Sequence, residues 1–339
     1  MWAGGTVLYN PSNELELNNT RAVCVEGIRD VTVKGQPGSE KVFVGIERRV
    51  GRILGDEDNA FIEAQRQLAQ DQEGRQGGSA AEAEGQGIGA QRMAQVEDRI
   101  RQRLWQEKDD DFGPDGECSI IERRNIVFMR DHEAPKSAPS SADSPDQPKK
   151  QPKMLKPTYK PNFFDHTIIP DAKLLFRFSA LTFNAHAIHL DPEYCRNVEG
   201  HRNLLFHGPL SYTFLVTLLR RKIEEREREA AQKGRSARAQ DEPEQHAREQ
   251  ATPLLQQARQ AMDNALGTGG QTGGANLAGH PEEVITKVEY RNLAPLYCGE
   301  KIRFCCYRDE ADPQRYEIWA ETPQGGIAVK GTAWLKVRH

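Results

Sequence analysis

LLFRFSALTFNAHAIHLDPEYCRNVEGHRNLLFHGPLSYTFLVTLL, residues 174–219, is the stretch that decides the fold. Its first part is rich in aromatic residues and predicts a strand. Polar side chains gather at the end of this strand: Asn184, His186, His189 and Asp191. Further along, His207-Gly208-Pro209 leads into a run of apolar residues. Histidines close to the start of a buried helix are a layout typical of catalytic sites.

The apolar run predicts a helix that is buried by the rest of the protein. Its members leave almost no polar face: Leu210, Tyr212, Phe214, Leu215, Val216, Leu218 and Leu219. A helix that is apolar on all sides must be surrounded by protein. Pro209 suits the first turn, where its missing N–H costs nothing. Strands are predicted after this helix at 282–290, 301–308, 315–321 and 327–337, so the expected class is α+β, with an antiparallel sheet wrapped around one helix.

The first part of the chain predicts a second group of strands. They are expected at 6–9, 22–26, 30–34, 41–50 and 119–128, and the first four indicate an antiparallel meander. A polar insertion at about 55–116 interrupts them. Gly85, Gly87 and Gly89 within it favour a flexible linker over a nucleotide-binding loop, because no strand precedes them. Met93, Val96, Ile100 and Leu104 recur at helical spacing and predict a helix at 91–105.

Composition divides the chain into three parts. Residues 1–130 are expected to form a partial N-terminal half, 131–160 a linker rich in Pro and Ser, and 161–339 the catalytic half. The charged and Gly-rich segment at about 221–281 is a further insertion, whose charged start is expected to extend the preceding helix. We expect both insertions to be disordered for much of their length.

Charge and hydropathy exclude several kinds of partner. The 339 residues carry a net charge of −4, with 37% hydrophobic and 28% charged residues, and the pI is near 6.2 with a mean hydropathy of −0.74. This acidic balance argues against nucleic acid. No apolar run approaches the roughly 18 residues of a membrane span, so we expect no membrane partner. The six cysteines have no metal-binding spacing and predict reduced, apolar side chains.

Asn184-Ala-His186-Ala-Ile188-His189-Leu-Asp191 resembles the hydratase motif of the MaoC-like, R-specific enoyl-thioester hydratases and dehydratases, which reads Asp-x-Asn-Pro-(Ile/Leu)-His-x-Asp. Asn184 stands where the wider family has its catalytic aspartate, and His189 stands on the catalytic histidine. His207-Gly208 matches the family's oxyanion position. The chain is most similar to the branch of hydroxyacyl-thioester dehydratases type 2 and of mesaconyl- and itaconyl-CoA hydratases, which carries Asn at this position.

This resemblance implies a double hot-dog fold, in which each half wraps a sheet around its own helix. MWAGG at 1–5 and ERRNIVFM at 122–129 also resemble the branch, in its first half. The strand and central helix expected before MWAGG have no counterpart here, so the first half is expected to be truncated. The resemblance also implies a single chain that contains both hot dogs, or a homodimer.

The same resemblance implies roles for individual residues. His189 is expected to act as general base and acid, Asn184 to orient the water or the imidazole, and the Gly208 N–H to bind the thioester oxygen. His186, His207 and Arg177 are the candidate substrate-binding residues. Each has an alternative: a supporting or solvent-facing role for His186, a turn-shaping role for His207 and a salt bridge on the sheet surface for Arg177. Asp191 is expected to cap or orient a neighbour.

The implied activity is reversible dehydration of 3-hydroxyacyl thioesters to trans-2-enoyl thioesters in fatty-acid synthesis. The expected substrate is an acyl thioester of acyl carrier protein or of CoA, with no cofactor and no metal, and the resemblance alone implies a mitochondrial location. Two alternatives stay open from the sequence. One is a hydratase of mesaconyl- or itaconyl-type CoA thioesters, and the other is a non-catalytic protein that binds acyl thioesters.

Overall fold

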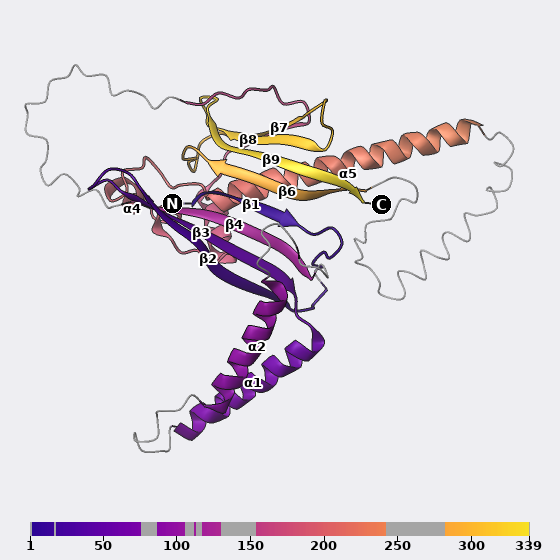
Figure 1. The fold of residues 1–339 in the computed structure, drawn as a ribbon. Coiled ribbons are helices and arrows are strands. Elements are labelled where there is room, and N and C mark those ends of the chain that lie inside the picture. Colours follow the sequence, from indigo (N-terminus) through magenta and orange to yellow (C-terminus); the bar gives the residue numbers. More distant parts are fainter. Residues whose placement is uncertain are drawn as a thin grey trace, which may run out of the picture. The chain divides into compact units, whose positions relative to one another are not determined.

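A single antiparallel sheet organises the computed structural model, which describes residues 2–16, 18–75, 87–105, 112, 117–129, 154–241 and 282–338 (Figure 1). The strands are β1 (Trp2–Tyr9), β2 (Ala22–Lys34), β3 (Lys41–Arg52), β4 (Cys118–Met129), β5 (Phe164–Ile168), β6 (Glu282–Asn292), β7 (Ile302–Arg308), β8 (Arg315–Glu321) and β9 (Ile327–Arg338). They lie in the order β2-β3-β4-β1-β6-β9-β8-β7-β5. The helices are α1 (Gly55–Arg75), α2 (Ile88–Leu104), α3 (Ala172–Leu181), α4 (Pro192–Asn197) and α5 (Gly208–Asp241).

The strand order contains an internal repeat. In the first group β2 pairs with β3, β3 with β4 and β4 with β1; in the second, β7, β8, β9 and β6 follow the same sequence of neighbours. Antiparallel pairing of β1 with β6, which sets Gly4 opposite Arg291, joins the two groups. The expected α+β class with a large antiparallel sheet is therefore confirmed, and it is built from two similar four-stranded groups.

The strand predictions for residues 2–129 hold with two corrections. The segments predicted separately at 22–26 and 30–34 form one strand, β2, with an irregularity between Ile28 and Asp30. Of the predicted meander, the pairing of β2 with β3 is confirmed, but β1 pairs with β4 and not with β2, so the meander is wrong at β1. Sequence periodicity identifies strands from their side chains, whereas the partner of β1 is set by contacts with distant segments.

Helix α5 contains both the apolar run and the charged run that follows it. Leu210, Leu215 and Leu219 are buried, as predicted. Thr213 and Thr217 are exposed, so the helix has one solvent-facing side and is not surrounded on all sides. The prediction that the charged residues extend this helix is confirmed as far as Asp241.

The chain forms two compact units. One comprises Met1–Thr217 with Val284–Lys336, and the other comprises Leu218–Glu283 with Val337–His339. Within the second unit Arg226 pairs with Glu283, and the Arg220 guanidinium donates to the Glu283 carbonyl oxygen at 2.9 Å. The sheet and the candidate site lie in the first unit.

The polar insertion contains two helices where one was predicted. In α2, Val96, Ile100 and Leu104 are buried and form a core with Val25 of β2 and Ile121 of β4, as the helical spacing predicts. Helix α1 was not predicted, because its apolar residues are too sparse to form a stripe. The flexible-linker prediction is wrong at 87–89, and it falls outside the described residues at 76–86.

Close packing of α1 against α2 accounts for the glycine at position 89, in the first turn of α2. A Cβ atom at this position would lie 2.3 Å from the Leu68 backbone nitrogen of α1. The glycine therefore permits close contact between the two helix backbones, and it is a packing residue instead of a flexible joint.

The aromatic-rich start of the deciding stretch is a helix, and the strand prediction is wrong. Asp171 caps α3, and its carboxylate accepts from the Leu174 N–H at 2.8 Å. Leu175 and Ser179, four residues apart, form the buried side. The strand propensity of the phenylalanines is overridden by this cap and by the helical spacing of the buried residues.

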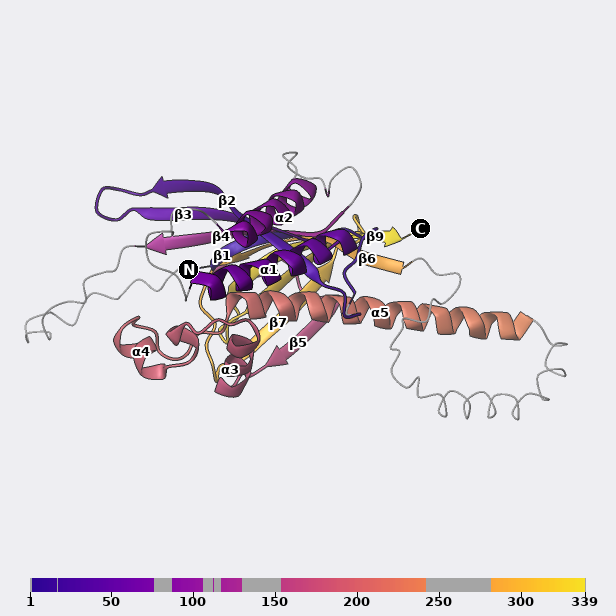
Figure 2. The same ribbon diagram turned by 90° about the horizontal axis from the view of Figure 1, so that it is seen from below.

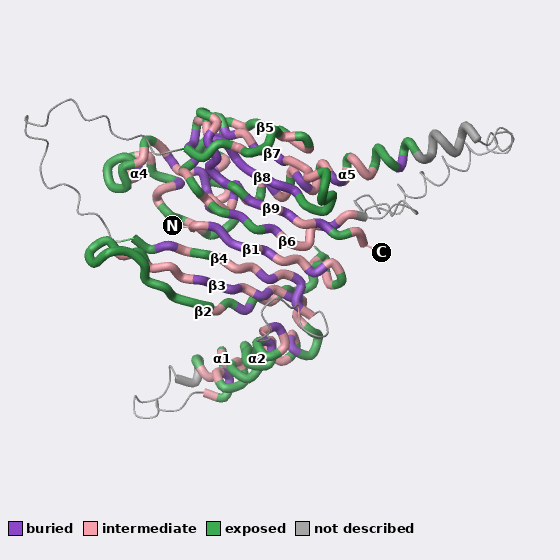
Figure 3. The backbone as a smooth tube through the Cα atoms, turned by 45° about the horizontal axis from the view of Figure 1, so that its top comes forward, coloured by how far each residue is buried: buried purple, intermediate pink, exposed green. Residues whose placement is uncertain are grey.

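An apolar part of the sheet is open to solvent. Val33, Val42 and Phe128 lie opposite one another across β2, β3 and β4, and Val31 and Val44 are paired in the neighbouring row. Val31, Val33 and Phe128 are each more than half exposed, and Figure 3 shows this end of β2 as exposed. No described helix of residues 2–129 covers these rows.

Two further findings concern the described residues. None of their helices is both long and apolar enough to cross a membrane. All six cysteines are free, as predicted, and every one except Cys24 is buried. The predicted linker between 131 and 153 lies outside the described residues, as does the Gly-rich part of the second insertion.

Candidate active site

His189 lies in a short 3-10 turn, Ala187–His189, between α3 and α4. Its Nδ1 atom lies 2.8 Å from the Leu205 carbonyl oxygen. A carbonyl oxygen can only accept, so Nδ1 carries the proton and Nε2 keeps its lone pair in the neutral ring. Nε2 forms no hydrogen bond within the described part of the chain. His189 is therefore held in the tautomer that a general base requires.

Residues 204–206 connect the turn that carries His189 to the loop after β6 through backbone hydrogen bonds. The Leu205 N–H donates to the Ile188 carbonyl oxygen at 2.9 Å, so Leu205 holds the 3-10 turn through both its backbone groups. On its other side the segment bonds to the loop after β6, where Phe206 N–H donates to Leu296. Figure 2 shows α3 and α4 beside the N-terminal end of α5. These backbone bonds place the base next to the start of α5.

Gly208 begins α5, and its N–H has no hydrogen-bond partner in the described structure. Unpaired N–H groups at a helix N-terminus, together with the helix dipole, favour a developing negative charge. A Cβ atom at position 208 would lie 2.8 Å from Nδ2 of Asn292 at the end of β6. That amide donates to the Trp2 carbonyl oxygen at 3.0 Å. The close approach of Asn292 accounts for glycine at this position.

His207 is completely buried beneath His189. The two imidazole rings are stacked, with centroids 3.6 Å apart and an interplanar angle of 19°. The His207 Nε2 atom lies 2.9 Å from the Ser179 hydroxyl on α3, while Nδ1 has no partner among the described residues. Since its exposure is 0%, His207 does not present a substrate-binding surface in this structure.

Burial sets the protonation of both rings. Desolvation, with a smaller contribution from His189, lowers the pKa of His207 to about 3, so its ring is neutral at physiological pH. Desolvation also lowers the pKa of His189, and the charge of His186 acts in the same direction, while the bond to Leu205 acts against them. A neutral His189 is therefore available as a base at and below neutral pH.

Asn184 and His186 lie close to His189 in the chain but make different contacts. The Asn184 amide oxygen accepts from the His186 N–H at 3.2 Å, and no hydrogen bond joins Asn184 to the His189 imidazole. His186 is exposed and caps the 3-10 turn, because its Nδ1 accepts from the Ile188 N–H. The predicted solvent-facing alternative for His186 is confirmed.

Asp191 and Arg177 lie outside this contact network. The Asp191 carboxylate accepts from the Glu193 and Tyr194 N–H groups and caps α4, so the capping prediction is confirmed. Arg177 is exposed on α3 and forms no ion pair with any described residue. The sheet-surface salt bridge offered for Arg177 is therefore wrong, because the residue is on a helix.

Sequence reasoning missed three residues that shape the site: Ser179, Leu205 and Asn292. Ser179 was hidden by the strand prediction, which gave it no fixed relation to His207. Leu205 acts through its backbone, which leaves no residue-type signal. Asn292 reaches the site through the sheet, far from the motif in sequence.

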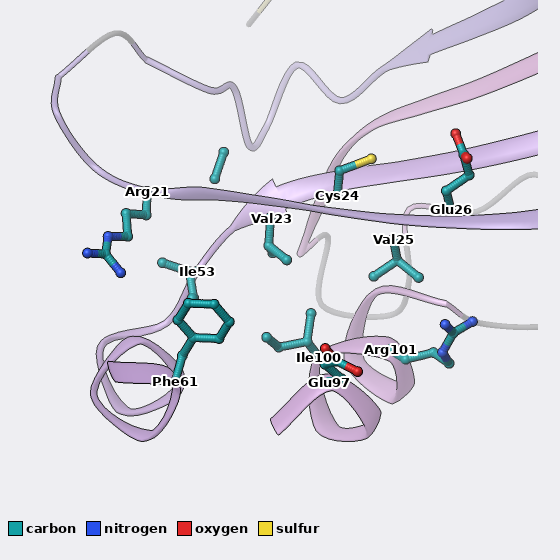
Figure 4. A pocket seen from close by; sticks show the side chains of 11 residues that line it. Arg21, Val23, Cys24, Val25, Glu26, Ile53, Phe61, Glu97, Ile100 and Arg101 are labelled. Atoms are coloured by element: carbon teal, nitrogen blue, oxygen red, sulfur yellow. The ribbon is translucent and has the colours of Figure 1, made fainter. Parts of the chain in front are cut away.

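A separate pocket of about 350 Å³ lies between β2, α1 and α2 (Figure 4). Its apolar lining includes Val23, Val25, Ile53, Phe61 and Ile100. None of the candidate catalytic residues contributes to it. In the described residues, no group of three or more His, Cys, Asp or Glu side chains is placed to hold a metal ion.

Residues 86–236 match the family described as hydroxyacyl-thioester dehydratase type 2. This range contains the whole motif and the start of α5, where the His189 ring stacks on His207, the residue before Gly208. Over this range the chain is similar to the hydroxyacyl-thioester dehydratases type 2.

A curated relative is the mesaconyl-C(4)-CoA hydratase of Chloroflexus aurantiacus, which is 56% identical to this chain over 54 residues. The match covers 16% of this chain and 19% of the relative. The chain thus spans about a fifth of the length of that relative.

Solved structures with partial similarity include a MaoC-like dehydratase from Phytophthora capsici, with 10% identity and a TM-score of 0.44, covering 99% of this chain and 72% of that one. Another is the full-length peroxisomal multifunctional enzyme type 2 from Drosophila melanogaster, with 10% identity and a TM-score of 0.47, covering 99% of this chain and 37% of that one.

Proposed function

We propose that this chain catalyses the reversible hydration of trans-2-enoyl thioesters to 3-hydroxyacyl thioesters. The observation that carries the proposal is the bond between His189 Nδ1 and the Leu205 carbonyl oxygen, because it leaves Nε2 as a free acceptor beside the start of α5. The family match to hydroxyacyl-thioester dehydratases type 2 supports the same chemistry.

In the hydration direction, Nε2 of His189 takes a proton from water while the water oxygen forms a bond to C3 of the enoyl group. The C2–C3 double-bond electrons move toward the thioester carbonyl, whose oxygen gains negative charge. The proton held by His189 then returns to C2, which gives the 3-hydroxyacyl thioester. Dehydration follows the same steps in reverse.

The N–H of Gly208 is suited to the developing charge on the thioester oxygen. It is an unpaired donor at a helix N-terminus, and the absence of a side chain allows the substrate to approach. Asn184 has a free amide nitrogen near the turn, which suits it to orient the attacking water. We assign it no role on the imidazole, since its amide oxygen is bonded to the His186 backbone.

Two substrate classes fit this chemistry: straight-chain 3-hydroxyacyl thioesters of acyl carrier protein, as in fatty-acid synthesis, and mesaconyl- or itaconyl-type CoA thioesters. The 56% identity with a mesaconyl-C(4)-CoA hydratase over 54 residues favours the second candidate. The family match favours the first.

Loss of the enoyl absorbance of crotonyl-CoA, of crotonyl carrier protein and of mesaconyl-CoA would test the proposal and separate the candidates. We expect His189→Ala to reduce the rate at least about 100-fold. The matched control is His166→Ala, which removes an exposed histidine of the edge strand β5, outside the motif, and should retain most activity. Equal rates for wild type and His189→Ala would overturn the role of His189. Binding without turnover of any of the three would favour the acyl-thioester-binding alternative.

A further inference from the structure

His207 is the buried group that the proposed reaction leaves without a role. Its side chain is fully buried. Its ring lies closer to the His189 ring than any other described ring does, with centroids 3.6 Å apart. Its own ring is held on two sides. The Ser179 hydroxyl bonds to Nε2, and the Phe178 ring meets it edge-on with centroids 5.0 Å apart.

We infer that His207 is a positioning residue, whose flat and neutral ring supports the imidazole of His189 and fixes the direction of its Nε2 lone pair. The inference rests on the proposed function, since it describes how the same site orders its base. A single hydrogen bond from Nδ1 to Leu205 leaves the imidazole free to rotate about that bond. The stacked ring removes this freedom, because rotation would bring the two rings into collision.

The neutrality of His207 matters when His189 takes up its proton. A second positive charge at this distance would oppose that step, whereas the face of an uncharged aromatic ring tolerates a cation. Since its pKa is lowered to about 3, His207 is uncharged near neutral pH, where His189 would act as a base. Among titratable groups, His186 from the same turn lowers the pKa of His189, and His189 in turn lowers the pKa of His207 at the start of α5.

Ser179 in turn fixes the ring of His207. It lies on the buried side of α3 at 4% exposure, one turn after Leu175. Helix α3 therefore positions Ser179, Ser179 holds the His207 ring, and that ring supports His189. This is a structural reason for the helix at 172–181, where the sequence predicts a strand.

The test compares His207→Phe, His207→Ala and Ser179→Ala with wild type in crotonyl-CoA hydration. Phenylalanine keeps a flat, neutral ring, so His207→Phe should retain most of kcat. His207→Ala should lower kcat by about 10- to 100-fold with little change in KM, because the base is misdirected rather than the substrate lost. It should also move the acid limb of the kcat/KM profile to higher pH, since water entering the vacated space relieves the desolvation of His189. The kcat of Ser179→Ala should lie between those of wild type and His207→Ala.

A matched control is His166→Ala, which removes an exposed histidine of the edge strand β5, where it pairs with Phe304 of β7. A purely structural role would lower activity only in proportion to folded protein, measured by circular dichroism, and would leave the pH profile unchanged. That outcome, or a loss in His207→Phe equal to that in His207→Ala, would overturn the inference. If His207→Ala does not fold, the Phe and Ser179 variants decide.

A readout that needs no activity separates this inference from the proposed function. The NMR titration of the His189 ring should shift to higher pH in His207→Ala and stay near wild type in His207→Phe, even if wild type hydrates none of the thioesters. An unshifted titration in both variants would overturn the positioning role while leaving the proposed function standing.

Discussion

Nδ1 of His189 lies 2.8 Å from the carbonyl oxygen of Leu205, and this bond directs the opposite nitrogen away from the backbone. The first prediction concerns its titration. A base must be unprotonated, and desolvation lowers the pKa of His189 below its ordinary value. The acid limb of kcat/KM for crotonyl-CoA hydration should therefore have its midpoint below about pH 6.5. A midpoint at or above that pH would contradict the burial of His189 in the working enzyme.

The stability of the protein should depend on pH through His207. Its pKa is about 3 in the folded protein, against about 6.5 when unfolded. Between these values the unfolded chain binds the proton and the folded chain does not, so stability falls as pH falls. The free energy of unfolding of wild type, relative to His207→Phe, should decrease by about 1.4 kcal/mol per pH unit in this window. Urea unfolding at several pH values measures it, and a constant difference would show that His207 is not buried as a neutral ring.

Gly89→Ala should separate α1 from α2. The new Cβ would lie 2.3 Å from the Leu68 backbone nitrogen, which cannot move aside as a side chain could. We expect a loss of about 1–3 kcal/mol in the free energy of unfolding. Gly55→Ala is the matched control, because nothing lies within 4 Å of its new Cβ. Similar stability for the two variants would argue against close packing at Gly89.

The buried ion pair between Glu57 and Arg103 should matter more than the exposed pair beside it. Glu57 is 1% exposed, and its carboxylate accepts from Arg103 at 2.7 Å. Glu57→Ala would leave the guanidinium short of a partner in a largely buried place, at a cost of about 3 kcal/mol. Asp56→Ala removes the exposed pair with Arg99 and should change stability little. Thermal or urea unfolding of both variants gives the comparison.

Tyr9 of β1 and Tyr212 of α5 should be coupled. Their hydroxyls are 2.6 Å apart, and both side chains are partly buried. Removing either hydroxyl leaves the other unpaired, so Tyr9→Phe and Tyr212→Phe should each destabilise, and the double variant should lose less than their sum. A double-mutant cycle in urea should give a coupling of about 1 kcal/mol. Additive losses would mean that the two hydroxyls do not bond in solution.

Much of the fold could be predicted from local sequence patterns. Alternating residues identified β3, β4 and the four C-terminal strands, and helical spacing identified α2 and the start of α5. The failures occurred where another interaction overrides the local pattern. The aromatic residues of α3 favour a strand until the Asp171 cap and the buried Leu175 and Ser179 are considered together. Helix α1 lacks an apolar stripe and is held in part by the ion pair of Glu57 with α2.

For the candidate site, the motif correctly predicted the capping role of Asp191, while the catalytic roles of His189 and Gly208 stay predictions. It could not show that Asn184 bonds to the backbone, because hydrogen-bond partners are not encoded in residue spacing. It also placed His207 among substrate-binding residues, although the ring is buried. Whether a histidine faces the substrate or the core depends on α3, whose secondary structure the sequence alone misread.

The seam between β1 and β6 has a consequence for how the site comes into being. Asn292 at the end of β6 donates to the carbonyl oxygen of Trp2 at the start of β1, a contact between residues 290 positions apart, and the same amide lies against Gly208. Contacts between such distant segments form slowly, because a long loop must close first. The surroundings of the Gly208 N–H, the proposed oxyanion donor, are thus completed only when β6 pairs with β1. The site would then become active late in folding, after β1 and β6 have paired and the two strand groups have formed one sheet.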